Sequence, residues 1–336
     1  MRKILSILLA LTFVLVALLA CKPAEHDPAS GEKPSKYSKG LEYEVNGNYC
    51  TITGIGSCKD TEIYIPEEIN GKAVKKIANH AFQDNTTVTK IWLPDTITEI
   101  GWEAFNGCSN LKIINIPQSA ETLGRRMFGG CLLDEFYCYS PYVNENKNSD
   151  FNIPKAKKII YGGADWCTKI SYNEAVEEVV LLDTVKFISF SECKNLKQVT
   201  IPDSVTYITK VAFSGCTKLT HITIPGSVKQ IDHEAFSGSY ATDVVLCEGV
   251  EEIAGKLGDY RNGYRYGAFS SCKINSISIP KSLKRIGAEA FAGSNLKVIT
   301  YAGTIAEWEQ IEKEEKWASD TSATVVHCTD GDVPIE

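Results

Sequence analysis

The stretch "IPDSVTYITKVAFSGCTKLTHITIPGSVKQIDHEAF", residues 201–236, repeats itself after 23 residues. The dipeptide Ile-Pro at residues 201–202 returns at 224–225, and Ala-Phe at 212–213 returns at 235–236. A period between about 20 and 50 residues is typical of stacked supersecondary units that are each too small to bury their own apolar face. The sequence therefore predicts a solenoid whose consecutive coils share one hydrophobic interior.

The residue that follows each apolar strand serves as a landmark for this repeat. The eleven landmarks are Pro66, Pro94, Pro117, Tyr139, Gly162, Leu182, Pro202, Pro225, Cys247, Pro280 and Ala302. Their spacings run from 20 to 33 residues. The residues one, three and six positions before a landmark are apolar almost throughout, and the alternation at one and three is typical of a strand with one buried face. We expect these strands to form one parallel sheet along the solenoid.

A second fixed position lies about 11 residues after each landmark and holds phenylalanine. Its occupants are Phe82, Phe105, Phe128, Phe151, Phe190, Phe213, Phe236, Phe269 and Phe291. Because one phenylalanine recurs in nearly every coil, we expect the rings to stack in register inside the solenoid. Three residues further on, five coils carry cysteine: Cys108, Cys131, Cys193, Cys216 and Cys272.

Twelve cysteines in an exported chain would ordinarily indicate disulfide bonds. Five of them share one repeat position, however, which favours buried free thiols that pack as small apolar residues. Two pairs outside that ladder remain candidates for bridges, Cys50 with Cys58 and Cys131 with Cys138. The sequence does not determine the state of these four residues.

The N-terminal segment has the features of an export signal. "MRK" is followed by an apolar run over residues 4–20 and then by Cys21. The residues "LLAC" resemble a bacterial lipobox, in which the cysteine is acylated and becomes the new N-terminus. An uncleaved membrane anchor is the alternative, although 17 apolar residues are marginal for a membrane span. Residues 22–40 are rich in Pro, Gly, Ser and charge, and we expect a flexible leash with a reach of about 25 Å.

The chain carries a formal charge of -7 and shows no clustered basic residues. This composition argues against nucleic acid as a partner. No phosphate-binding glycine loop, GxSxG, HExxH or CxxC motif is present, so we expect no catalytic residues, no metal site and no cofactor. The tripeptide "DHE" at 232–234 suggests acid–base chemistry, but it fills a variable turn position, and a solvated turn is the simpler interpretation.

Two surfaces are candidates for binding another protein. The first is the column of residues two positions before each landmark, whose N-terminal half contains Tyr64, Trp92 and Tyr137. The charged residues expected around this apolar stripe are Glu62, Lys90, Glu135 and Lys158. Outward aromatic stripes of this kind often mark protein contacts. Ordinary cross-strand aromatic packing also accounts for the same column.

The second candidate surface is the insertion "GKLGDYRNGYRYG", which lengthens one coil by about ten residues. Its candidate contact residues are Tyr260, Arg261, Tyr264 and Arg265. Tyrosine and arginine dominate binding hot spots, and loops inserted into repeat proteins commonly carry recognition. A glycine-rich surface loop without a binding role is the alternative.

The repeat Leu-x-x-Ile-x-Ile-Pro, Ser-Val-x-x-Ile, Ala-Phe-x-x-Cys resembles the BspA-like leucine-rich repeat of bacterial surface proteins over roughly residues 60–302. The resemblance implies a leucine-rich-repeat solenoid with a parallel β-sheet on one face, short strands and tight helical turns on the other, and a cap at each end. Asn46-Gly47 suggests a capping hairpin, and "IAEWEQIEKEEKW" suggests a helix over the last coil, with the valines at 325–326 closing the edge. The landmarks at 139–162 and 162–182 bound two coils that depart from the pattern.

These expectations divide the chain into five segments. They are a lipoprotein signal peptide over 1–20, a lipid-anchored flexible linker over 21–40, an N-terminal cap over 41–65, the solenoid over 66–302 and a C-terminal cap over 303–336. The sequence by itself supports a non-catalytic binding scaffold, exported and held at the membrane through a lipid on Cys21. The resemblance implies adhesion to host matrix or bacterial proteins at the cell surface or outer membrane. A structural envelope lipoprotein without a soluble ligand is the alternative.

Overall fold

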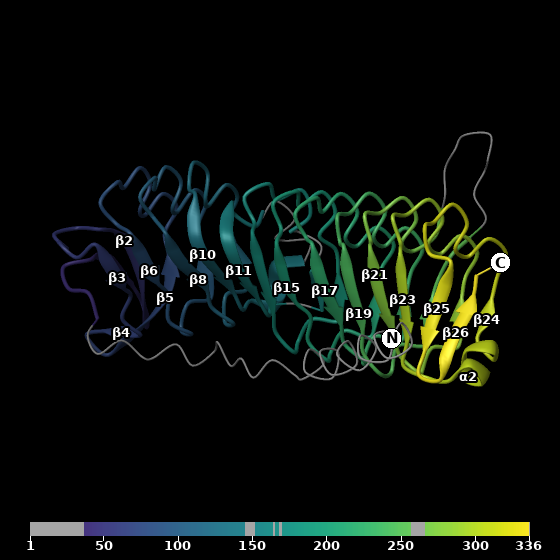
Figure 1. The fold of residues 1–336 in the computed structure, drawn as a ribbon. Helices are drawn as coiled ribbons and strands as arrows, with labels where there is room; N and C mark the ends of the chain where they lie inside the picture. Colours follow the sequence, from purple (N-terminus) through teal and green to yellow (C-terminus); the bar gives the residue numbers. More distant parts are fainter. Residues whose placement is uncertain (1–36, 145–151, 164, 168–169, 257–265, 336) are drawn as a thin grey trace. The chain divides into compact units, whose positions relative to one another are not determined.

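The computed structural model describes residues 37–144, 152–163, 165–167, 170–256 and 266–335. The chain forms two compact units. The N-terminal unit contains His26–Lys169 and Glu178–Val185, and the C-terminal unit contains Ile170–Glu177 and Lys186–Glu336. Within each unit the chain winds as a parallel β-solenoid, as the repeat predicts (Figure 1).

Two sheets form the walls of the N-terminal unit. The first sheet has the order β13-β11-β10-β8-β6-β3. Its strands are β3 (Glu62–Tyr64), β6 (Lys90–Trp92), β8 (Ile113–Ile116), β10 (Leu133–Cys138), β11 (Ala156–Tyr161) and β13 (Glu178–Leu181). The second sheet has the order β1-β2-β5-β7-β9, with β4 paired to β5. Its strands are β1 (Glu42–Asn46), β2 (Tyr49–Gly54), β4 (Glu68–Ile69), β5 (Lys72–Ile77), β7 (Glu99–Ile100) and β9 (Thr122–Leu123).

The C-terminal unit repeats the same plan. Its first sheet has the order β17-β19-β21-β23-β25-β26, and its second sheet has the order β16-β18-β20-β22-β24. The strands of the first sheet are β17 (His221–Ile224), β19 (Asp243–Leu246), β21 (Ser276–Ile279), β23 (Val298–Tyr301), β25 (Val325–Cys328) and β26 (Gly331–Pro334). Those of the second are β16 (Tyr207–Ile208), β18 (Gln230–Ile231), β20 (Glu252–Ile253), β22 (Arg285–Ile286) and β24 (Glu312–Lys313). The remaining elements are η1 (Pro141–Asn144), β12 (Trp166–Cys167), β14 (Phe187–Ile188), β15 (Gln198–Thr200) and α2 (Ile305–Glu309).

The predicted phenylalanine stack runs through the interior of each unit. In the N-terminal unit the Phe105 ring centroid lies 5.8 Å from Phe82 and 5.7 Å from Phe128. In the C-terminal unit Phe236 lies 4.9 Å from Phe213, with an interplanar angle of 13°. Both registers follow from the parallel ladder, which places equivalent side chains of neighbouring coils above one another. Phe151 lies outside the described residues.

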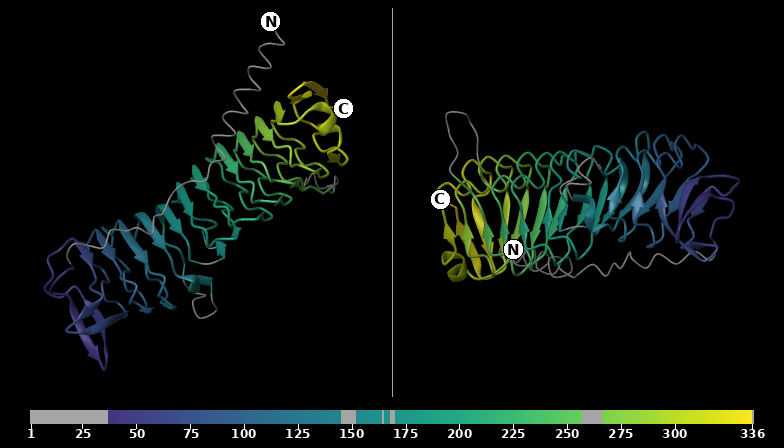
Figure 2. Two further views of the ribbon diagram at one scale, coloured as in Figure 1. Left: turned by 90° about the horizontal axis from the view of Figure 1, so that it is seen from below. Right: turned by 180° about the vertical axis from the view of Figure 1, so that it is seen from behind.

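The tight helical turns expected opposite the first sheet are wrong. Each typical corner consists of successive hydrogen-bonded turns that contain two left-handed residues four positions apart, such as Glu103 (φ 53°) with Gly107 (φ 75°) and Glu234 (φ 58°) with Gly238 (φ 66°). An α-helix requires consecutive right-handed residues, so no helical turn spans such a corner. The turns are held by bonds between coils, for example from Phe105 N–H to the Met127 carbonyl at 3.0 Å. Figure 2 shows these turns along the side opposite the sheet strands.

One departing coil keeps the interior plan with a different side chain. Ile170 takes the phenylalanine position, because its carbonyl accepts from the Cys193 thiol as the Phe190 carbonyl accepts from the Cys216 thiol. Ile170 is fully buried and Tyr172 follows it in a left-handed conformation (φ 65°). The sequence pattern missed this substitution because Ala-Phe is absent from the coil.

The segments at the two ends differ in detail from the expected caps. A hairpin of β1 and β2 forms around Asn46 and Gly47. At the other end α2 has only five residues, and Trp308 is its buried side chain. The Lys313 ammonium donates to the carbonyls of Trp308 and Ile311, which satisfies groups beyond the helix end, and β24 then pairs with β22. The outer strand of the first sheet is β26, which pairs antiparallel with β25, so the valines of β25 do not form the edge.

Candidate functional site

The first sheet of the N-terminal unit brings the three predicted aromatic residues together. Tyr64 on β3 lies opposite Trp92 on β6, and Tyr137 on β10 lies opposite Asn115 on β8. The side chains alternate along each strand, so the buried neighbours Ile63 and Phe136 face the interior while the aromatic column faces outward. All three aromatic side chains are half-buried. The sequence therefore placed these residues on the correct face.

The contact between Trp92 and Tyr137 depends on Asn115, which the repeat pattern did not single out. The Asn115 amide turns back onto the neighbouring strand, accepting from the Leu93 N–H at 2.7 Å and donating to the Leu93 carbonyl at 2.9 Å. Asn115 is only 3% exposed. Because this side chain does not project between them, the Trp92 and Tyr137 rings meet edge to face, with centroids 5.4 Å apart and an angle of 70°.

Tyr139 extends this group, since its ring centroid lies 6.3 Å from that of Tyr137. We call Tyr64, Trp92, Tyr137 and Tyr139 the aromatic cluster. Tyr139 occupies a landmark position where most coils carry proline, and this exception is the sequence signal that identifies it.

Charged side chains hold the hydroxyl groups of the aromatic cluster. The Lys90 ammonium donates to the Tyr64 hydroxyl at 2.9 Å, and that hydroxyl donates to Glu62 at 3.2 Å. The ammonium also lies 5.0 Å from the centroid of the Tyr64 ring and 5.7 Å from that of Trp92, within the range of cation–π attraction. Both charged residues were expected around the stripe. They fix the orientation of Tyr64.

Tyr137 is fixed in the same way at the other end of the cluster. Its hydroxyl donates to the Glu135 carboxylate at 2.5 Å. Burial, followed by the hydrogen bond and charge of Glu135, raises the pKa of Tyr137 well above its usual value. The hydroxyl is therefore a proton donor at physiological pH. Beyond it Lys158 forms an ion pair with Glu178 at 2.9 Å.

The aromatic cluster has the properties of a contact surface for another protein. Rigid aromatic rings with oriented hydroxyl groups provide apolar area and directed hydrogen bonds at a low entropic cost. Every hydroxyl described above already has a partner, and none is paired with a base that would turn it into a nucleophile. The arrangement therefore suits binding rather than covalent chemistry.

The other predicted site residues lie outside the described residues. These are the lipidation site Cys21 and the loop residues Tyr260, Arg261, Tyr264 and Arg265. They remain predictions.

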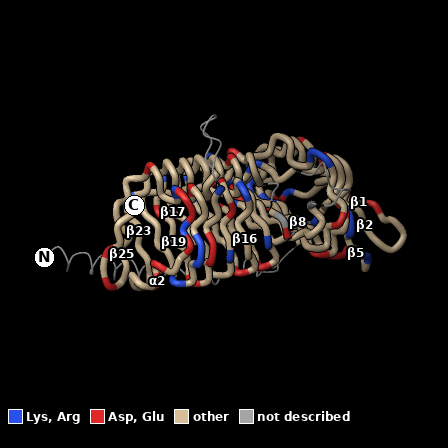
Figure 3. The backbone as a smooth tube through the Cα atoms, turned by 90° about the vertical axis from the view of Figure 1, so that its right-hand side faces the viewer, with Lys and Arg blue, Asp and Glu red and all other residues tan. Residues whose placement is uncertain are grey.

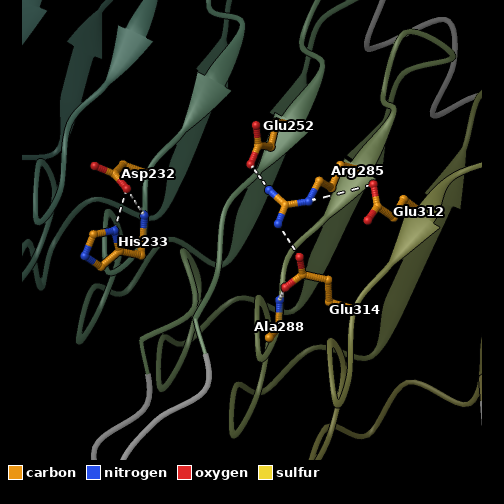
Figure 4. Close-up of polar contacts among 7 residues, drawn as sticks. All are labelled: Asp232, His233, Glu252, Arg285, Ala288, Glu312 and Glu314. Carbon is orange, nitrogen blue, oxygen red and sulfur yellow. Dashed lines mark hydrogen bonds and ion pairs between the residues drawn. The ribbon is translucent and has the colours of Figure 1, made fainter.

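The "DHE" tripeptide forms a saturated hydrogen-bond cluster on the C-terminal unit (Figure 4). The Asp232 carboxylate accepts from the Tyr207 hydroxyl at 2.6 Å and from the His233 backbone N–H at 2.7 Å, and His233 Nδ1 lies 2.5 Å away. Burial alone would raise the pKa of Asp232, but the hydrogen bonds from Tyr207 and His233 outweigh it and hold the pKa below its usual value. This cluster ties β16 to the turn after β18.

A second polar cluster on the same sheet links three coils through Arg285 (Figure 4). The guanidinium contacts Glu252 at 2.5 Å, Glu312 at 3.9 Å and Glu314. Glu314 also accepts from the Ala288 N–H at 3.0 Å. The charges are mutually compensated, which is typical of a network that holds neighbouring coils in register.

Within the described part of the chain, no group of three or more His, Cys, Asp or Glu side chains is placed to hold a metal ion. None of the described helices is long and apolar enough to cross a membrane.

Ten of the described cysteines are buried free thiols. They include Cys50, Cys58, Cys131 and Cys138, the four whose state the sequence left undetermined. The repeat-position thiols bond to the preceding coil, as from Cys131 to the Phe105 carbonyl at 3.2 Å and from Cys216 to the Phe190 carbonyl at 3.2 Å. Burial raises the pKa of Cys131 to about 11, so this thiol stays protonated and unreactive at neutral pH.

Parallel strands repeated at intervals of 20 to 33 residues, an interior phenylalanine stack and short second strands define a leucine-rich-repeat solenoid. A profile described as the BspA type leucine rich repeat region matches in six copies, over residues 75–173, 167–257 and 264–311. These matches cover more than half of the sequence. The chain therefore belongs to the BspA-type leucine-rich repeat family, whose members are scaffolds that generally lack catalysis and bind other proteins.

Several solved structures are similar to this chain. A leucine-rich repeat protein from Bacteroides ovatus is 18% identical, with 88% of this chain and 100% of that chain covered and a TM-score of 0.34. A leucine rich cell surface protein from Faecalibacterium prausnitzii is 19% identical, with 84% and 99% covered and a TM-score of 0.32. The leucine rich repeat protein of T. pallidum is 22% identical, with 66% and 84% covered and a TM-score of 0.27. A search of curated proteins gave no significant match.

Proposed function

We propose that this protein is a non-catalytic adhesion scaffold at the bacterial cell surface, and that the aromatic cluster contacts the partner protein. The observation that carries the proposal is the edge-to-face contact of Trp92 with Tyr137 on the outer face of a regular sheet. The charged residues that hold the hydroxyl groups keep this apolar surface in one conformation, which lowers the entropic cost of binding. The family match supports protein binding as the general role.

A matched pair of tryptophan variants tests this surface. Trp92→Ser removes the centre of the cluster, whereas Trp102→Ser removes a tryptophan that is 54% exposed and stacks on Arg125 elsewhere in the same unit. The purified proteins are titrated against immobilised extracellular-matrix proteins and against intact host and bacterial cells. We expect saturable binding that falls about 30-fold or more with Trp92→Ser and stays unchanged with Trp102→Ser.

Thermal unfolding of both variants separates loss of contact from loss of fold. Equal binding by Trp92→Ser and the parent protein would return the aromatic cluster to simple cross-strand packing. Absence of saturable binding to every matrix protein and cell type would favour the structural envelope lipoprotein.

The inserted loop is proposed as a second contact surface. The triple variant Tyr260→Ala/Arg261→Ala/Tyr264→Ala is compared with the parent protein in the same titrations. We expect weaker binding, because tyrosine and arginine side chains supply much of the energy of protein interfaces. Unchanged binding would remove the loop from the contact.

Anchoring through a lipid on Cys21 is the remaining part of the proposal. The lipobox-like sequence, followed by a polar leash over residues 22–40, supports a scaffold that is tethered to the membrane and held above it. Expression of Cys21→Ser in a bacterial host, followed by fractionation and fatty-acid labelling, tests this point. We expect the parent protein to carry label in the membrane fraction and the variant to carry none. Equal labelling of the two would exclude Cys21 as the acylated residue.

A further inference from the structure

The strand β1 has a backbone edge that is available for pairing. It forms the end of the second sheet of the N-terminal unit and pairs antiparallel with β2, while no other strand among the described residues pairs with its opposite side. The two-residue loop after Asn46 makes Asn46 and Tyr49 the first hydrogen-bonded pair of the hairpin, and bonded and non-bonded pairs then alternate. The N–H and C=O groups of Tyr43 and Val45 therefore point away from β2.

The side chains of β1 give this edge two different faces. Tyr43 lies opposite Ile52, and Val45 lies opposite Cys50. Ile52 and Cys50 are fully buried, so Tyr43 and Val45 continue the apolar inner face of the solenoid past its last covered strand. Val45 is 51% exposed and is among the few large apolar residues that the described part of the chain leaves in solvent.

The opposite face of β1 is acidic. Glu42 and Glu44 are both exposed, and no described lysine or arginine forms an ion pair with either of them. Their surroundings have the same sign, since residues 41–71 contain six acidic side chains and one lysine. Figure 3 marks acidic positions in red beside β1. The edge thus combines free backbone groups, an apolar row and a negative row.

We propose that β1 binds an extended segment of a partner protein as an added strand, and that this segment alternates apolar residues with Lys or Arg. Its apolar side chains lie beside Tyr43 and Val45, and its cations lie beside Glu42 and Glu44. A second copy of this chain is a poor occupant, because a two-fold pairing of β1 with itself sets the acidic rows against each other. This surface lies on the second sheet and is separate from the aromatic cluster on the first sheet.

The test uses two fluorescent peptides, "TKVKVKVT" and its acidic counterpart "TEVEVEVT", with blocked ends. Fluorescence anisotropy measures their binding to the full chain at low ionic strength. We expect the basic peptide to bind at least about tenfold more tightly than the acidic one, because like charges on paired strands are unfavourable. Hydrogen exchange of the fragment that contains β1 should slow when the basic peptide is present, because the amides of Tyr43 and Val45 become bonded.

Two sets of variants decide whether β1 is the site. Val45→Pro removes an outward N–H at an edge position that tolerates proline, whereas Val45→Thr keeps the N–H and alters only the side chain. We expect Val45→Pro to weaken binding of the basic peptide by about tenfold or more and Val45→Thr to change it much less. The double reversal Glu42→Lys/Glu44→Lys should invert the preference and favour the acidic peptide. It remains informative if Val45→Pro fails to fold.

Three outcomes would overturn the proposal. They are equal binding of the two peptides, retention of binding by a folded Val45→Pro variant, and concentration-dependent dimerisation that Val45→Pro abolishes. Trp92→Ser should bind the basic peptide as the parent protein does, which keeps this test separate from that of the aromatic cluster.

Discussion

The N-terminal and C-terminal units share an interior plan and differ on the outer face of the first sheet. Inside, phenylalanine rings stack at 5.7 Å in one unit and 4.9 Å in the other. Outside, the N-terminal unit carries the aromatic cluster, whereas the C-terminal unit carries short hydroxyl side chains such as Ser278 and Thr300, which lie 3.3 Å apart. The interior admits few side chains because each must fit the space left by its neighbours. The outer face is free of that constraint, so the recognition chemistry is expected where the two units differ.

The largest expected effect breaks the shared interior. Phe105→Ala in the N-terminal unit and Phe213→Ala in the C-terminal unit should each lower the free energy of unfolding by about 3 to 5 kcal/mol, because each leaves a cavity between two stacked rings. Denaturant unfolding monitored by tryptophan fluorescence measures both. Thr223→Ala on the outer face of β17 is the control and should change stability by less than about 0.5 kcal/mol. A similarly small effect of Phe213→Ala would contradict the stacked interior.

A smaller effect sharpens the difference between the outer faces. Asn115→Ala removes both hydrogen bonds to Leu93 and leaves a buried N–H and C=O unpaired, so unfolding should become easier by about 1 to 3 kcal/mol. Asn115→Asp keeps the acceptor and loses the donor, and it should lie between Asn115→Ala and the parent protein. The control is again Thr223→Ala. Equal stability of Asn115→Ala and Thr223→Ala would show that the outer columns of the two units are equivalent.

The smallest effect concerns the thiols that the units have in common. Burial raises the pKa of Cys131 and of Cys193 from 9.0 to about 11. The unfolded chain therefore loses these protons at lower pH than the folded chain. The stability present below about pH 9 should fall as the pH rises towards 11, by at most about 1.4 kcal/mol per pH unit for each thiol.

Unfolding measured at intervals between pH 8 and 10.5 tests this pH dependence. Cys131→Ser and Cys193→Ser do not titrate in this range and still donate to the preceding carbonyl, so each should reduce the slope by a similar amount. An unchanged slope would mean that other groups cause the pH dependence.

The site was accessible to sequence reasoning in part. The alternation before each landmark placed Tyr64, Trp92 and Tyr137 on one face, because side-chain direction in a strand depends only on parity. Sequence reasoning did not find the ring contact of Trp92 with Tyr137, because it skips one strand and requires the intervening Asn115 side chain to fold back. No local pattern encodes that choice, which depends on the position of Leu93 in the neighbouring coil.

The corners show the same division. The period of the repeat determined that coils stack, which residues face inward and where the phenylalanine rings lie, because equivalent positions superpose in a parallel ladder. It did not determine the turn conformation. Left-handed residues at Glu103 and Glu234 carry no glycine signal and are held there by hydrogen bonds from adjacent coils. Ile170 likewise takes a phenylalanine position that its own coil does not mark.

The sequence by itself determined the solenoid, its buried face and the candidate surfaces, since these follow from periodicity and from the direction of side chains along a strand. The tertiary structure alone decided the turn geometry, the protonated state of the buried thiols and the contacts within the aromatic cluster. Those features depend on distances between side chains that belong to different coils, and such distances exist only after the coils have stacked.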